Sequence, residues 1–182
     1  MKLENNKYPF EDNSFDFVSS LCVFEHIIFV EDVLFEIKRV LKPGGKILIM
    51  SPNWSGINSV LHGIKSVIFK NDRYWRYESF SDILKGILNI PIFYLKIILH
   101  KNPIFFIIEP RIKNNKINFE RSDDDAVHLC HPLSFKKWFK KNNFKIIKYN
   151  RFNGVTKLSK IFNTLFPSFS TTNFIIAEKR YQ

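Results

Sequence analysis

The chain has 182 residues, of which 45% are hydrophobic and 25% are charged, so it can bury the core of a single domain. It contains only two cysteines and no run of about 20 apolar residues, which excludes a disulfide-rich secreted domain and a membrane-spanning protein. With no signal segment at its start, the sequence predicts a cytoplasmic protein, and peripheral attachment to a membrane is the open alternative.

The formal net charge of +11 is unevenly distributed. Residues 1–36 hold 2 basic and 8 acidic side chains, whereas residues 37–182 hold 26 and 9. Such a surface suits an anionic partner, either a phospholipid face or a phosphorylated substrate, and an ordinary solvated surface is the alternative. No nucleic-acid-binding motif accompanies the charge, so nucleic acid is not an expected partner.

A strand, a helix and a second strand are predicted between Phe15 and Asn53. Phe15 to Cys22 and Ile47 to Met50 are short apolar runs of the kind that forms buried parallel strands. Between them, Val30 to Leu41 repeats apolar residues at spacings of three and four, with acidic residues first and basic residues last. Pro43-Gly44-Gly45 ends this helix, so the pattern predicts a β-α-β unit.

Residues 54–130 are predicted to form an insertion, because this stretch is far longer than the usual connection in a compact α/β domain. Helical spacing covers Gly56 to Phe69, and Phe80 to Leu88 favours another short helix before Pro91. Two interpretations of the apolar stretch that follows are open. As a cap it would bury its apolar face over a substrate pocket; as an interfacial segment it would place four aromatic side chains in lipid: Phe93, Tyr94, Phe105 and Phe106.

The segment 122–131, SDDDAVHLCH, gathers carboxylates, a thiol and two histidines. The spacing of His128 and His131 does not match a zinc site, and no second ligand cluster accompanies them, so no metal is predicted. An acidic loop before a helix is the plainer interpretation. That helix is predicted over Pro132 to Lys141, and strands are predicted over Phe144 to Tyr149 and Asn173 to Glu178, with a further helix around Leu158 to Leu165.

Three phrases carry a family resemblance: YPFEDNSFDFV from Tyr8, FEHI from Phe24 and EIKRVLKPGGKILI from Glu36. Together they resemble the middle of a class I S-adenosylmethionine-dependent methyltransferase of type 11, over roughly residues 4–53. The resemblance implies an α/β fold with strands four to seven of a Rossmann-like sheet, the last one antiparallel. Residues 1–182 would form a single incomplete methyltransferase-like domain, with 54–130 as a mainly helical inserted cap.

The resemblance also implies S-adenosylmethionine as the cofactor. Its expected contacts are Glu4 near the adenine amino group, then Ser19, Ser20, Leu21 and Glu25 at the carboxyl end of the first strand and in the loop after it. His26 is the candidate base or orienting donor, and a histidine held by backbone near a helix start is the alternative. The candidate substrate-binding residues are Asn53, Trp54, His128 and His131.

The family's first half carries a glycine-rich cofactor loop that has no counterpart here, since all 6 glycines lie at position 44 or later. We therefore expect a truncated product or a remnant, and no cofactor binding by the chain alone that calorimetry can measure, so that micromolar affinity would contradict the expectation. Phe15 to Cys22 would then present an open apolar strand edge that could pair with the missing half or with another copy.

The expected function is methyl transfer from S-adenosylmethionine to a small-molecule, saccharide or lipid-linked acceptor. The alternative is a non-catalytic remnant or a membrane-peripheral module that binds an anionic partner.

Overall fold

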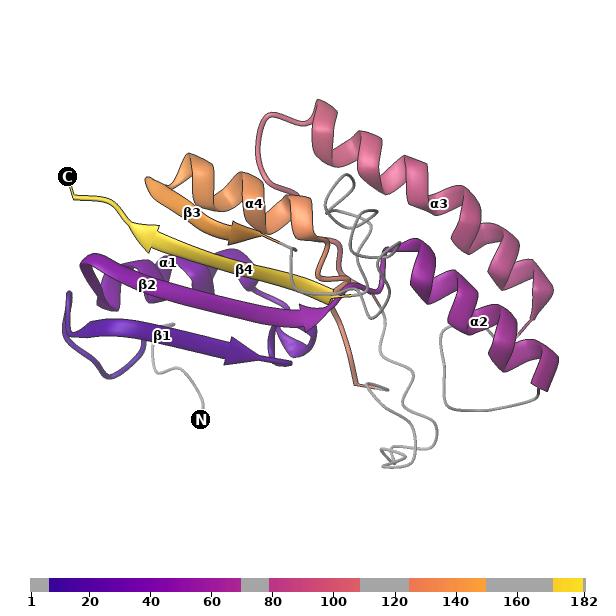
Figure 1. Cartoon of the computed structure of the whole chain (residues 1–182), viewed down its shortest axis with the longest axis horizontal. Coiled ribbons are helices and arrows are strands. Elements are labelled where there is room, and N and C mark those ends of the chain that lie inside the picture. Colours follow the sequence, from indigo (N-terminus) through magenta and orange to yellow (C-terminus); the bar gives the residue numbers. More distant parts are fainter. Residues whose placement is uncertain (1–6, 70–78, 109–124, 150–171, 182) are drawn as a thin grey trace.

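The computed structural model describes residues 7–69, 79–108, 125–149 and 172–181 (Figure 1). The predicted contact Glu4 and the predicted helix around Leu158 to Leu165 lie outside these residues. The described part is an α/β arrangement in which a four-stranded sheet carries helices on one face, and two further helices extend beyond the end of the sheet.

The sheet has the order β1-β2-β4-β3. β1 (Phe15–Leu21) runs parallel to β2 (Leu41–Pro52), and β4 (Thr172–Lys179) runs antiparallel to both β2 and β3 (Phe144–Tyr149). This confirms the four strands that the sequence predicts and the antiparallel pairing of the last two. β1 lies at one edge, with β2 as its neighbour among the described strands.

Helix α1 (Val30–Val40) ends where predicted, but β2 begins immediately at Leu41 and is longer than the expected run Ile47 to Met50. Pro43-Gly44-Gly45 therefore lies in a bulge of β2, between the pairs Phe15–Leu41 and Phe17–Lys46. Gly44 adopts a φ of +79°, and a Cβ on Gly45 would come within 2.8 Å of the Lys42 carbonyl oxygen. The glycines thus allow the chain to leave α1 and join the sheet within a few residues.

The Glu36–Arg39 pair, from the stretch EIKRVLKPGGKILI, stabilises the local structure. Arg39 donates hydrogen bonds to the Glu36 carboxylate, to the carbonyl oxygens of Tyr8 and Phe10, and to Asp12 at 2.6 Å. Glu36 also accepts from the backbone N–H of Tyr8 at 2.9 Å. The hydrogen bond from Arg39 holds the pKa of Glu36 below its ordinary value. These five residues, called the latch below, fix the segment before β1 onto α1.

Helix α4 (Pro132–Lys141) covers the sheet next to α1, and together they bury the main core. Trp138 is fully buried, and its ring lies 5.3 Å from that of Phe35 on α1. As predicted, proline stands in the first turn of α4. After the helix, Asn143 takes the left-handed conformation, with φ 65°, before β3.

The insertion contains α2 (Ile57–Phe69) and α3 (Phe80–Leu99), which extend beyond the carboxyl end of β2 (Figure 1). The predicted short helix Phe80 to Leu88 is wrong in length, since α3 continues through Pro91. Pro91 is exposed, so its ring has room on the solvent side, and the helix tolerates the missing hydrogen bond. Among the described residues, no helix is both long and apolar enough to cross a membrane.

Candidate active site

A groove of about 420 Å³ runs along β1, from Phe15 to Leu21, between this strand and α1, and it includes the carboxyl end of the strand. Ser19, Ser20 and Leu21, the predicted cofactor contacts, all line it, and Val23 and Phe24 continue the lining beyond the strand. Cys22 adopts a φ of 52°, which turns the chain sharply at this point. In open α/β sheets, ligands bind at the carboxyl ends of parallel strands, so the groove occupies the expected position.

The resemblance implies that the methionine side of S-adenosylmethionine lies at this strand end. The groove lining there is mainly apolar, with two serines, which would suit the methylene groups and the polar end of the methionine chain. Ser19, Ser20 and Leu21 would hold the methionine portion. When bound, the cofactor supplies an activated methyl group.

The loop after β1 forms a short 3-10 helix, η1 (Phe24–His26), which is tied to a distant segment. The Glu25 carbonyl oxygen accepts hydrogen bonds from the backbone N–H groups of Val127 at 2.7 Å and His128 at 2.9 Å. The Glu25 side chain is fully buried. Two groups of predicted site residues, about a hundred positions apart in the sequence, are therefore brought together.

His26 lies between two carboxylates in this arrangement. Its Nδ1 is 3.2 Å from Asp125 Oδ1, and its Nε2 is 3.9 Å from Glu25 Oε1. About a third of its side chain is exposed, 32%. The contact with Asp125 on one ring nitrogen fixes the orientation of the His26 imidazole.

His128 and His131 are buried and serve the local structure. Burial lowers the pKa of His128 to about 4 and that of His131 to about 3, so both are neutral near pH 7. His128 Nδ1 lies 3.2 Å from the Phe24 carbonyl oxygen and 3.3 Å from Cys130 Sγ. His131 Nδ1 accepts from the Leu133 N–H and caps α4. These contacts position η1 and α4 beside each other.

Asn53 and Trp54 follow β2 at the same edge of the sheet. The buried Asn53 amide oxygen accepts from the Ser55 hydroxyl at 2.6 Å and from the Ser55 N–H at 3.2 Å, a turn that leads into α2. Trp54 instead lines a second cavity of about 180 Å³, together with α3 residues. The structure thus separates these two predicted substrate residues.

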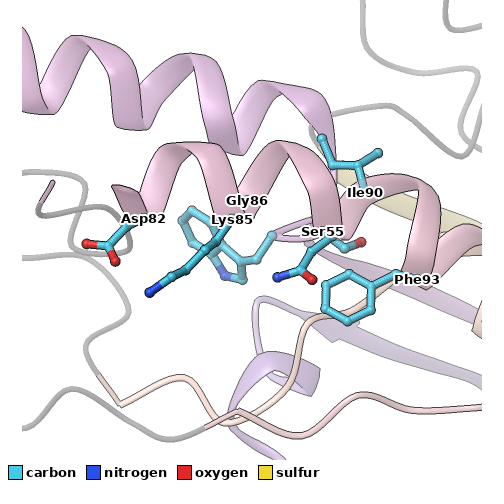
Figure 2. Close-up of a pocket in the computed structure, with 8 residues that line it drawn as sticks. Ser55, Asp82, Lys85, Gly86, Ile90 and Phe93 are labelled. Atoms are coloured by element: carbon cyan, nitrogen blue, oxygen red, sulfur yellow. The ribbon is translucent and has the colours of Figure 1, made fainter. Parts of the chain in front are cut away.

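The second cavity lies between the start of α2 and one side of α3 (Figure 2). Figure 2 shows Asp82, Lys85 and Phe93 projecting from the same side of α3. Asn89 and Ser55 complete the polar lining. A carboxylate, an ammonium group and an amide beside an indole and a phenyl ring are suited to bind a small polar molecule.

Sequence reasoning missed several of these residues. Asp125 belongs to the acidic run that precedes His128, but its pairing with His26 depends on how two distant loops meet. In the sequence, nothing distinguishes Asp82, Lys85 and Asn89 from ordinary polar residues on the exposed side of a helix. In the part of the chain that the structure describes, no group of three histidine, cysteine or carboxylate side chains could hold a metal ion.

The four-stranded order β1-β2-β4-β3, with β4 antiparallel to its neighbours, agrees with the α/β sheet that the resemblance to class I methyltransferases implies. A family model described as "Methyltransferase domain" matches residues 2–49. Over 42 residues the chain is 52% identical to phosphoethanolamine N-methyltransferase 2 of Caenorhabditis elegans, which is 23% of this chain and 10% of that protein. The resemblance to class I S-adenosylmethionine-dependent methyltransferases is therefore confirmed.

Two methyltransferases are among the solved structures that are similar to this chain. An S-adenosylmethionine-dependent methyltransferase from Methanosarcina mazei is 16% identical, with a TM-score of 0.47, and the match covers 99% of this chain and 66% of that one. For another from Mesorhizobium loti, the identity is 10%, the TM-score is 0.46, and the coverage is 97% and 68%. The chain thus spans about two thirds of these solved relatives and a tenth of the curated one.

Proposed function

We propose that this chain acts in S-adenosylmethionine-dependent methyl transfer and that its described residues form the side of the site that meets the methyl acceptor. The main support is the placement of His26, which pairs with Asp125 at 3.2 Å and belongs to η1, the loop that directly follows the β1 strand end. Ser19, Ser20 and Leu21 line the groove there, and Val23, Phe24 and Ile27 line it on either side of His26.

In this proposal the chain positions two reactants and removes a proton. The groove holds the methionine side of the cofactor, which places a methyl donor at the carboxyl end of β1. His26, oriented by Asp125, takes the proton that an O–H or N–H acceptor loses as it is methylated. Burial of Phe24 and Glu25 keeps the loop that carries His26 in place.

The acceptor is proposed to be a small polar molecule, a saccharide or a lipid-linked group. The cavity beside Trp54 supports this choice because it combines Asp82, Lys85 and Asn89 with two aromatic rings. Saccharide hydroxyls form hydrogen bonds with such groups, while the ring faces of a sugar stack on aromatic side chains.

The test is a titration of the ¹⁵N-labelled chain with S-adenosylmethionine, followed by amide chemical shifts. The described residues contact only one side of the cofactor, so we expect affinity weaker than micromolar, on the order of millimolar. The shift changes should be confined to the β1 strand end and η1. Ser20→Phe, which fills the groove, should abolish them.

Ser81→Phe in the first turn of α3 is the matched control, because Ser81 is exposed and lies away from the groove. It should leave the titration unchanged. Shift changes elsewhere in the chain, or none at millimolar cofactor, would refute the proposal.

A further inference from the structure

The outer side of α3 presents a continuous apolar surface. Along the helix, large apolar residues recur at spacings of three and four and remain 43% to 80% exposed. We call this set the outer stripe: Phe80, Leu84, Ile87, Leu88, Ile92, Leu95, Ile98 and Leu99. An apolar stripe of this kind normally packs into a protein core, so its exposure indicates a surface that binds a partner.

The orientation of α3 is fixed by contacts on its other sides. Ile83 and Ile97 are 5% and 1% exposed and face inward. At the start, Ser79 and Asp82 form a capping box. At the end, the Lys137 ammonium group on α4 donates to the carbonyl oxygens of Ile97, at 2.6 Å, and of Ile98 and His100. The helix is thus held at both ends, and the outer stripe stays turned outward.

Lysines border the outer stripe. On a helical projection, Lys85 and Lys96 follow one side of it, and Lys101 comes just beyond its end; all three are exposed. Asp82, the acidic residue of α3, is engaged in the capping box. Figure 1 shows α3 along the outer margin of the molecule, beside α2 and beyond the end of the sheet. A flat apolar strip with a cationic border therefore faces away from the body of the protein.

The aromatic residues that the interfacial interpretation places in lipid are instead partly buried in the protein. Phe93 and Phe106 stack with ring centroids 4.6 Å apart, and Tyr94 and Phe105 are half-buried. They join the exit of α3 to the rest of the fold. The apolar groups available to a partner are therefore the aliphatic side chains of the outer stripe.

We propose that the outer stripe docks on an anionic membrane surface, with α3 lying in the plane of the bilayer. The helix is about 30 Å long at 1.5 Å per residue, and it would sink its apolar side into the boundary between head groups and acyl chains. Lys85, Lys96 and Lys101 would reach anionic head groups along its border. This inference does not rest on methyl transfer, although Lys85 also lines the cavity beside Trp54.

Charge favours a bilayer over a second copy of the chain. In an antiparallel symmetric pair of outer stripes, Lys85 of each copy would approach Lys96 of the other, and Asp82 is already engaged by its cap. An anionic head-group layer, by contrast, neutralises them. The overall charge of +11 acts in the same direction.

The experiment is co-sedimentation of the full chain with vesicles of phosphatidylcholine alone or mixed with phosphatidylglycerol. We expect binding to the mixed vesicles that weakens as salt is raised. Leu84→Gln, Leu88→Gln and Leu95→Gln combined should weaken it by about tenfold or more. The matched control combines Ile28→Gln, Ile107→Gln and Ile147→Gln, which are 52%, 51% and 48% exposed outside α3. It should bind like the wild type.

Charge reversal provides a second variant that keeps the stripe intact. Lys85→Glu with Lys96→Glu should lose binding to the mixed vesicles, whereas Lys46→Glu with Lys145→Glu, on exposed positions of the sheet, should lose much less. Three results would overturn the inference: no binding of the wild type to mixed vesicles, equal loss in stripe and control variants, or a dimer that the stripe variant dissociates without any vesicle binding. The last would make the outer stripe an interface between copies.

Discussion

The sheet and the α2–α3 hairpin use apolar residues in opposite ways. Fifteen buried residues from α1, α4, η1, the strands and Cys130 form one cluster around Trp138. The hairpin has a buried cluster of two, Val60 and Ile83, with three partly buried neighbours. Yet α3 is as rich in aliphatic side chains as any strand of the sheet, and most of them are exposed.

This difference shows that apolar content alone does not locate a core. In the sheet region, apolar residues lie where two layers meet, and burying them stabilises the fold. In the hairpin, the described residues provide a partner for only one side of α3. What remains is a surface whose apolar character serves no packing role within the described residues.

The largest expected effect is on the stability of the sheet region. Trp138→Ala removes the largest side chain of the main core and should lower the free energy of unfolding by about 3–5 kcal/mol. Val60→Ala in the hairpin should lower it by only about 1–2 kcal/mol. Urea denaturation followed by circular dichroism measures both, and equal losses would contradict the division into a strong and a weak core.

The second-largest effect on stability is expected for the latch. Arg39→Met removes hydrogen bonds to Glu36, Asp12 and two carbonyl oxygens at once, so the midpoint of thermal unfolding should fall clearly. Lys42→Met is the control, because its ion pair with Asp16 is largely exposed and should contribute little. If Arg39→Met and Lys42→Met unfold at the same temperature, the Glu36–Arg39 pair does not fix the segment before β1.

A smaller, pH-dependent effect should mark His131. Its pKa falls from 6.5 to about 3 on folding, so between these values the unfolded state binds a proton that the folded state does not. This contribution to stability is full above pH 6.5 and is lost as the pH falls toward 3. His131→Asn keeps a capping side chain and cannot titrate, so its stability should match the wild type at pH 7.5 and decline less by pH 5. If the wild type and His131→Asn lose the same stability between pH 7.5 and pH 5, His131 is not buried as described.

The smallest expected effect on stability is that of a substitution on the exposed outer stripe. Leu88→Gln on the outer stripe should change the free energy of unfolding by no more than about 0.5 kcal/mol, because this side chain is 57% exposed. Urea denaturation under the same conditions as for Trp138→Ala checks this. A loss comparable to that of a core substitution would mean that the outer stripe is covered within the molecule.

The sequence allowed the sheet region to be predicted because its signals are local. The apolar periodicity of α1, the proline that opens α4 and the asparagine before β3 each specify their own element. The length of α3 was not predictable in the same way, since Pro91 normally ends a helix and here lies on an exposed side. The pairing of His26 with Asp125 was not predictable either, because it arises from backbone hydrogen bonds between η1 and residues 127–128.

The central claim is that the two regions bind different partners, a methyl donor at the β1 strand end and a bilayer on α3. Amide hydrogen exchange by mass spectrometry tests both in one sample, with S-adenosylmethionine and phosphatidylglycerol-containing vesicles added separately and together. We predict that the cofactor slows exchange only in peptides covering residues 19–26, and that vesicles slow it only in peptides covering residues 80–99. Protection of the same peptides by both ligands, or of neither region by its own ligand, would contradict the account.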